Sequence, residues 1–197
     1  MKIEISRDDV LKLLGYKGLP KKVLLDAIDH MLEAAEETIA PSMVFKEIKE
    51  ESPIPVFYEG AALRYVGIVT IGSKLEDRVV ELFESGQPTE AYILDVIGSL
   101  AASKAGNLFW ESLRHDAASK GFPRGVRRAP GCQGVDMETQ GWLFEQLRGQ
   151  NIHVNISSTY MMIPRKSLSF VARFGGRMKR TFSCAGCRQF AECSMKG

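Results

Sequence analysis

The chain carries an almost unbroken apolar run, LRYVGIVTI, at residues 63–71 of its 197. Valine, isoleucine and tyrosine favour strands, and a run of this length without polar alternation is typical of a strand covered on both faces. Gly72 and Ser73 follow the run and end it. The run therefore predicts a buried strand and makes a sheet part of the core.

Helices are predicted on both sides of this strand. Apolar residues recur at helical spacing over 19–38, over 75–83 and from Pro88 to about residue 116. Further strands are expected at four stretches: 43–49, 152–156, 160–163 and 167–174. Because helices and strands do not alternate regularly, the order predicts an α+β fold, with a mixed, largely antiparallel, twisted sheet packed with long helices. One domain over residues 1–197 is expected, with 1–85 open to forming a smaller N-terminal lobe.

The middle of the long helix is crowded with small residues, since residues 98–106 read GSLAASKAG. Each glycine costs a helix about 1 kcal/mol relative to alanine. The cost requires compensation from a neighbour that approaches closely. Close packing is the favoured interpretation, and contact with a ligand is the alternative.

Charge is divided unevenly along the chain. Residues 1–119 hold 13 Lys/Arg against 20 Asp/Glu, and residues 120–197 hold 13 against 4. This asymmetry favours an anionic partner for the C-terminal part, either a small ligand or an acidic protein; mutual neutralisation of the two parts is the alternative. The basic residues come without a zinc finger, helix-turn-helix or RNA-binding aromatic motif, which argues against nucleic acid.

The chain begins with the charged stretch MKIEISRDD, which argues against a signal peptide. No apolar run approaches the roughly 18 residues that a membrane helix needs. These features predict a soluble, cytoplasmic protein.

Residues 127–134, RRAPGCQG, are the most informative stretch for function. They end the turn-rich segment 121–134 and come just before a predicted helix, for which Asp136 is a plausible N-cap. Glycine lets a backbone approach a ligand, a helix N-terminus attracts anions, and arginine can bind a carboxylate or phosphate through two hydrogen bonds. The stretch thus predicts an anion site, with a surface turn bearing two solvated arginines as the alternative.

Three segments together resemble the activation domain of cobalamin-dependent methionine synthase. Residues 127–132, Arg-Arg-Ala-Pro-Gly-Cys, resemble that domain's Arg-Pro-Ala-Pro-Gly-Tyr sequence, which binds S-adenosylmethionine. The stretch SSTYMMIPRKS at 157–167 resembles one found in stand-alone versions of the domain, and the helix around DVIGS at 95–99 is similar as well. With a cysteine-bearing C-terminus, the resemblance runs from about residue 88 to the end.

The resemblance implies an accessory protein that docks on a methionine synthase lacking its own activation domain. There it would present S-adenosylmethionine to the cob(II)alamin that the synthase carries, while a flavodoxin-like or other donor supplies an electron and methylcobalamin is regenerated. The protein's share is binding, orientation and electrostatics. It would therefore be the activation subunit of a methyltransferase, with no catalytic acid, base or nucleophile of its own. His30, His115 and His153 show no spacing typical of a catalytic site.

The same resemblance implies roles for individual residues of the 127–132 stretch. Arg127 would hold the methionine carboxylate, and Ala129 and Gly131 would offer backbone contacts to the adenosine. Cys132 is the fourth residue assigned to this site, and it stands where the family has an aromatic tyrosine.

Tyr160 and Arg165 complete the predicted cofactor-binding residues. Tyr160 and the apolar residues that follow it are also open to a plain core role. Arg165 and Lys166 are expected to be exposed and able to contact the cobalamin periphery or an acidic partner. Serines stand at Ser158 and near Ser103, where stand-alone relatives carry glutamates whose loss weakens binding of a cationic ligand.

The C-terminal cysteines are candidate metal ligands. Cys184, Cys187 and Cys193 supply three thiols, and Cys132 is a potential fourth. Four thiolates can hold zinc or an iron–sulfur cluster, whereas a labile disulfide and free thiols are the alternatives. A second hypothesis for the whole chain follows from this, namely a module that binds a corrinoid protein or redox partner through a cysteine-bound metal or cluster, without a working S-adenosylmethionine site.

Overall fold

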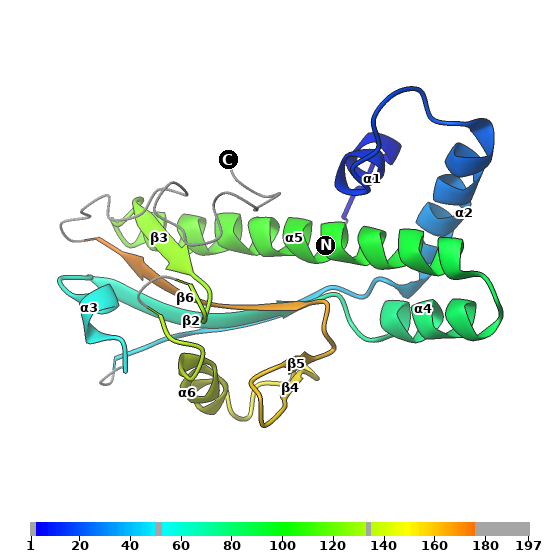
Figure 1. Cartoon of the computed structure of the whole chain (residues 1–197). Coiled ribbons are helices and arrows are strands. Elements are labelled where there is room, and N and C mark those ends of the chain that lie inside the picture. The colour runs from blue at the N-terminus through cyan, green and yellow to red at the C-terminus, as the bar shows by residue number, and fades with distance from the viewer. Residues whose placement is uncertain (1–2, 50–52, 133–134, 176–197) are drawn as a thin grey trace.

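The structure is a computed structural model, and it describes residues 3–49, 53–132 and 135–175. The described helices are α1 (Arg7–Leu13), α2 (Lys22–Thr38), α3 (Pro55–Tyr58), α4 (Lys74–Glu84), α5 (Pro88–Ser119) and α6 (Thr139–Gln146). The described strands are β1 (Ser42–Glu47), β2 (Leu63–Thr70), β3 (Gly125–Arg128), β4 (Asn155–Ile156), β5 (Met162–Ile163) and β6 (Ser167–Phe174). Figure 1 shows α5 running along one face of the main sheet, with α6 and the β4–β5 hairpin on the other face.

The main sheet has the strand order β1-β2-β6-β3, and each neighbouring pair is antiparallel. Strand β2 lies inside it, paired with β1 on one side and with β6 on the other. Its residues are buried from Tyr65 to Thr70, as the apolar run predicts. The expected α+β fold with an antiparallel sheet is therefore confirmed.

The two faces of the sheet bury different side chains, because successive residues of a strand point to opposite sides. On the α5 face, Phe170 and Phe174 of β6 pack with Tyr65 of β2 and with Phe109 and Leu113 of α5. Fully burying a side chain of this size stabilises a fold by about 1.5–3 kcal/mol. This contact fixes α5 against β6, which matters for the site described below.

The opposite face packs on α6. Val66 and Val171 of the sheet join Leu143, Leu147 and Val154 in one buried cluster. The helix therefore holds the loops on its two sides close to β6.

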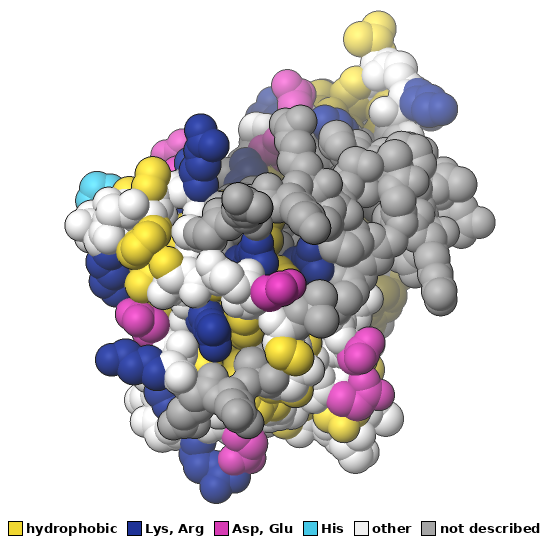
Figure 2. Space-filling view, turned by 90° about the vertical axis from the view of Figure 1, so that its left-hand side faces the viewer, with side chains coloured by type: hydrophobic (Ala, Val, Ile, Leu, Met, Phe, Trp, Pro, Cys, Tyr) yellow, Lys and Arg dark blue, Asp and Glu magenta, His cyan; other side chains and the backbone are white. Residues whose placement is uncertain are grey.

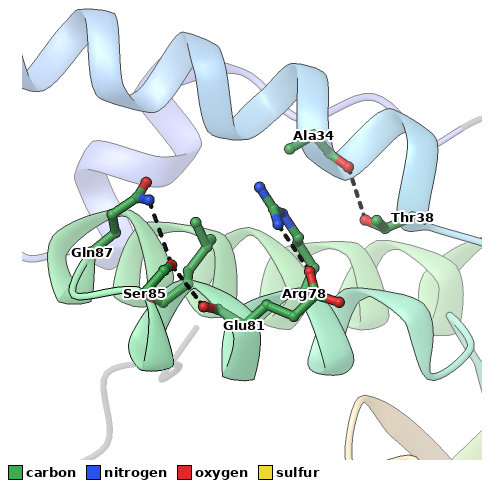
Figure 3. A network of polar contacts seen from close by, with 7 residues as sticks. Ala34, Thr38, Arg78, Glu81, Ser85 and Gln87 are labelled. Atoms are coloured by element: carbon green, nitrogen blue, oxygen red, sulfur yellow. Dashed lines mark hydrogen bonds and ion pairs between the residues drawn. The ribbon is translucent and has the colours of Figure 1, made fainter.

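The N-terminal half of α5 is covered by α1, α2 and α4 in a third cluster. Polar contacts line the C-terminal part of α4 (Figure 3): Arg78 pairs with Glu81 at 2.8 Å within the helix, and the Ser85 hydroxyl at its end donates to the Glu81 carbonyl at 2.7 Å. Gly86 then reverses the chain with a φ of +76°.

Strands β1 and β2 share the sheet of β6 and β3, and whether residues 1–85 also form a separate lobe stays a prediction.

Most predicted elements are present with shifted ends. The helices expected at 19–38 and 75–83 span Lys22–Thr38 and Lys74–Glu84, and the long helix reaches Ser119. The strands expected at 152–156 and 160–163 shrink to the two-residue strands β4 and β5.

Two local predictions were wrong. Residues 125–128 form strand β3, although the sequence places them in a turn-rich segment. Helix α6 begins at Thr139 with Glu138 at its N-cap, so Asp136 is not the cap. Turn-forming residues around β3 hide this strand, which obtains its backbone hydrogen bonds by pairing with β6. The helix after residue 136 was expected, and only its start differs.

The small residues of α5 serve close packing. A Cβ added at Gly98 would lie 2.6 Å from Leu75 Cδ2, and one at Gly106 would lie 2.8 Å from Leu168 Cδ1. These approaches compensate the helix cost of glycine, in agreement with the favoured interpretation.

Candidate functional site at the open edge of strand β6

Strand β6 is paired unequally on its two sides. Strand β2 pairs with all of β6, from Ser167 to Phe174, whereas β3 pairs only with residues 171–174. On the β3 side, residues 167–170 have no strand partner within the described part of the chain. We call this stretch the open edge. Helix α5 lies on one face of the sheet, and from the other face Gln140 of α6 contacts Ser169 of the open edge.

Arg127 lies beside the open edge and is held by α5. Its Nη1 donates to the Gly106 carbonyl, and its Nη2 donates to Asn107 Oδ1 at 2.7 Å. The guanidinium also lies over the Trp110 ring, 5.6 Å from its centroid. Burial lowers the pKa of Arg127, yet a guanidinium remains charged in proteins. Arg127 is therefore held by the middle of α5, and its expected position beside a helix N-terminus is wrong.

Arg128 occupies the opposite face of the sheet, because β3 is a strand and its side chains alternate. Its guanidinium lies 5.0 Å from the centroid of the Phe57 ring. Burial and the nearby charge of Arg173 lower its pKa. The two adjacent arginines therefore do not converge on one ligand, and only Arg127 faces α5.

The residues after β3 form a tight turn that leads toward α6. The Gly131 N–H donates to the Val135 carbonyl at 2.9 Å, and the Cys132 N–H donates to the Ala129 carbonyl at 3.1 Å. Gly131 has a φ of +83°, which favours glycine. Ala129, Gly131 and Cys132 are exposed, whereas Pro130 is buried. Three of the predicted contact residues thus share one solvent-facing turn.

Tyr160 packs on α6, on the face of the sheet opposite the Arg127 side chain. Its carbonyl accepts from Gln140 Nε2 at 2.7 Å, and Gln140 Oε1 accepts from the Ser169 hydroxyl at 3.0 Å. Its ring lies against Gly141, where an added Cβ would be 3.4 Å from Tyr160 Cε1. Because Ser169 belongs to the open edge, Gln140 connects Tyr160 to it.

Lys166 was expected to be exposed, and that expectation is wrong. Its side chain is only 12% exposed and pairs with Asp95 at 2.8 Å and with the Ser99 hydroxyl at 2.9 Å. Its backbone N–H donates to Glu76 Oε1 at 2.6 Å. The predicted segments 95–99 and 157–167 therefore meet at this lysine, while the neighbouring Arg165 is exposed as expected.

Several contributors to this region carry no sequence signal. In the sequence, Gln140 cannot be told from any other polar helix residue, and Asn107 is marked only by the small-residue stretch beside it.

Figure 2 views the end of the molecule that carries α3 and β3, where Lys and Arg side chains are numerous and a few Asp and Glu side chains lie between them.

The candidate metal ligands Cys184, Cys187 and Cys193 lie outside the described residues. Cys132 is exposed as a free cysteine. Among residues 3–49, 53–132 and 135–175, no group of three or more His, Cys, Asp or Glu side chains is placed to hold a metal ion.

A cavity of about 410 Å³ lies away from the open edge, between the N-terminal segment, α2 and α5. Its lining includes Ile5, Leu32 and Ile97, and none of the predicted site residues. No helix in the described part of the chain is both long and apolar enough to cross a membrane.

Comparison with solved structures is informative, whereas the two sequence comparisons find nothing. No protein-family model and no curated protein matches the sequence. Among solved structures, the crystal structure of the MetH reactivation domain bound to AdoHcy superposes with a TM-score of 0.59 at 14% sequence identity. The match covers 85% of this chain and 73% of that chain. At this identity the likeness concerns the fold, and the chain accordingly has a fold similar to that of the MetH reactivation domain.

Proposed function

We propose that the chain is an accessory protein for reductive reactivation of a cobalamin-dependent methionine synthase, to which it presents S-adenosylmethionine. The observation that carries the proposal is the open edge of β6 with Arg127 beside it, in a fold similar to that of a reactivation domain that binds AdoHcy. The synthase would be one that lacks its own activation domain.

Arg127 fits the carboxylate of the ligand's amino-acid end. A guanidinium has five N–H donors in a planar fork, and the bonds to Gly106 and Asn107 engage Nη1 and Nη2 once each. Donors therefore remain for a carboxylate. The contacts with α5 and Trp110 fix the side chain in advance, which reduces the entropy lost on binding.

The exposed turn fits the nucleoside end. Ala129 and Gly131 are both exposed, and Ala129 presents only a small side chain, so a ligand can reach the solvent-facing side of the turn. Because both residues follow Arg127 within four positions, one extended ligand can contact the arginine and the turn together.

The chemistry itself would come from the bound groups, since the sulfonium of S-adenosylmethionine supplies a methyl group. The protein would bind the ligand and hold it in one orientation, which is the usual role of a protein in such reactions. Cobalamin would remain on the synthase, and a flavodoxin-like or other donor would supply the electron. Arg165, exposed just before β6, is suited to contact an anionic group of the docked partner.

A reactivation assay tests this function. Oxidised synthase without its own activation domain is incubated with the chain, S-adenosylmethionine and a chemical reductant, and methionine formation is measured. We expect the wild type and Arg124→Ala to restore turnover and Arg127→Ala to fail, because Arg124 is an exposed arginine just outside β3. Failure of the folded wild-type chain to restore methionine formation would contradict the proposal.

A further inference from the structure

The side chain of Met137 lies directly on the Gly131 turn. A Cβ added at Gly131 would be 2.8 Å from Met137 Cε and 4.0 Å from its sulfur. The thioether therefore occupies the space that any larger residue at position 131 would fill. Met137 is nevertheless 44% exposed, so one side of it faces solvent.

The backbone around Met137 is fixed. Its carbonyl accepts from the Gln140 N–H at 2.9 Å, and the Thr139 N–H donates to the Asp136 carbonyl at 3.1 Å. The residue thus stands in a hydrogen-bonded turn at the entry to α6. Its unbranched side chain keeps three rotatable bonds and can adjust to what it contacts.

We propose that Met137 forms the apolar contact for the nucleobase of the ligand whose carboxylate Arg127 binds. The proposal rests on the proposed function, since it names the side chain that receives the adenine. Arg127 and Gly131 are four residues apart, so at most about 14 Å of chain separates them. An extended ligand with an anionic end and an aromatic end matches this span.

The neighbouring side chains make Met137 the one suited to this contact. Ala129 and Cys132 are exposed but small, and Pro130 is buried in the turn. A thioether is polarisable and packs favourably at the edge of an aromatic ring. If Met137 only covers Gly131, its side chain stabilises the turn, and removing it leaves the ligand affinity unchanged.

Calorimetry with two ligands separates the roles. AdoHcy has both an amino-acid end and an adenosine end, whereas 5′-methylthioadenosine keeps the adenosine and lacks the carboxylate. We expect Met137→Ala to weaken binding of both ligands about fivefold. Arg127→Ala should weaken only AdoHcy. Met161→Ala is the matched control, because Met161 is a methionine of similar exposure, 54%, located on the β4–β5 hairpin.

The outcomes are distinguishable. If the wild type binds both ligands and Met137→Ala binds them equally well, the role of Met137 is overturned and the proposed function stays in place. Wild-type binding of neither ligand overturns both proposals. A loss that Met161→Ala reproduces also overturns the role of Met137, because it would mark a general effect of removing an exposed methionine.

Discussion

Arg127 donates a hydrogen bond to the backbone carbonyl of Gly106, in the middle of the 32-residue helix α5. This contact joins the edge strand β3 to the longest helix of the described structure. A Cβ at Gly106 would lie 4.0 Å from Arg127 Nη1, an ordinary contact distance, but only 2.8 Å from Leu168 Cδ1. The glycine that weakens the helix thus makes room for Leu168 of the open edge beside the arginine.

The two packed glycines of α5 should respond differently to alanine. At Gly98 the new Cβ would lie 2.6 Å from Leu75 Cδ2, and Leu75 is fully buried and cannot move aside. Overpacking of this kind costs about 1–3 kcal/mol. At Gly106 the obstructing Leu168 is 40% exposed and can rotate away, while alanine favours the helix by about 1 kcal/mol.

We therefore expect Gly98→Ala to lower the free energy of unfolding and Gly106→Ala to leave it within about 1 kcal/mol of wild type. Urea titration followed by circular dichroism measures both. Equal stability of the two variants would contradict the packing described for α5.

The ion pair between Lys166 and Asp95 should contribute more than the exposed pairs do. Lys166 is 12% exposed, and its bonds to Asp95 and Ser99 join β6 to α5. A double-mutant cycle with Lys166→Met and Asp95→Asn should give a coupling free energy of roughly 1 kcal/mol. The pair of Arg148 and Glu145, with side chains 77% and 59% exposed, is the control and should give about 0.5 kcal/mol or less. A Lys166–Asp95 coupling no larger than this control would show that the pair does not stabilise the junction.

The elements that the sequence predicts well have local signals. The run at 63–71 is apolar on both faces, and the pattern from Pro88 onward stays helical over many turns, so each element follows from its own residues. Strand β3 has no such signal. Its four residues, Gly125–Arg128, become a strand only through pairing with β6, about 46 positions later in the chain.

The residues of the candidate site could be proposed from the sequence, but their geometry could not. The motif at 127–132 points to Arg127 and Gly131, yet strand alternation places Arg128 on the other face, which a turn assignment cannot foresee. Lys166 reads as a solvated lysine, and only the fold brings Asp95 and Ser99 to it. No sequence motif marks Met137, because its contact with Gly131 arises only in the folded structure.

Acid should remove a contribution of Asp9 to stability. Hydrogen bonds from Lys104, and then from the Ser6 backbone N–H, lower the pKa of Asp9 from its ordinary value of 3.8 to about 2. A carboxyl with a lowered pKa in the folded state stabilises the fold above its unfolded-state pKa, and the effect is lost as the pH falls through the folded-state pKa. Both side chains are more than one third exposed, so the contribution is small.

We therefore expect the difference in urea midpoint between wild type and Asp9→Asn to be constant above about pH 5 and to shrink between about pH 4 and pH 2. Lys104→Met removes the same interaction from its other partner and should show the same pH dependence. A difference that persists unchanged at pH 2 would contradict the assigned interaction.

We propose above all that Arg127 binds the carboxylate of S-adenosylmethionine beside the open edge of β6. Isothermal titration calorimetry of S-adenosylmethionine into the wild type, Arg127→Ala and the control Arg124→Ala tests it most directly. We predict binding to the wild type and to Arg124→Ala, and an affinity about 10- to 100-fold lower for Arg127→Ala, since a hydrogen bond to a charged group is lost. Equal affinity of Arg127→Ala and wild type, or no binding to the folded wild type, would contradict the claim.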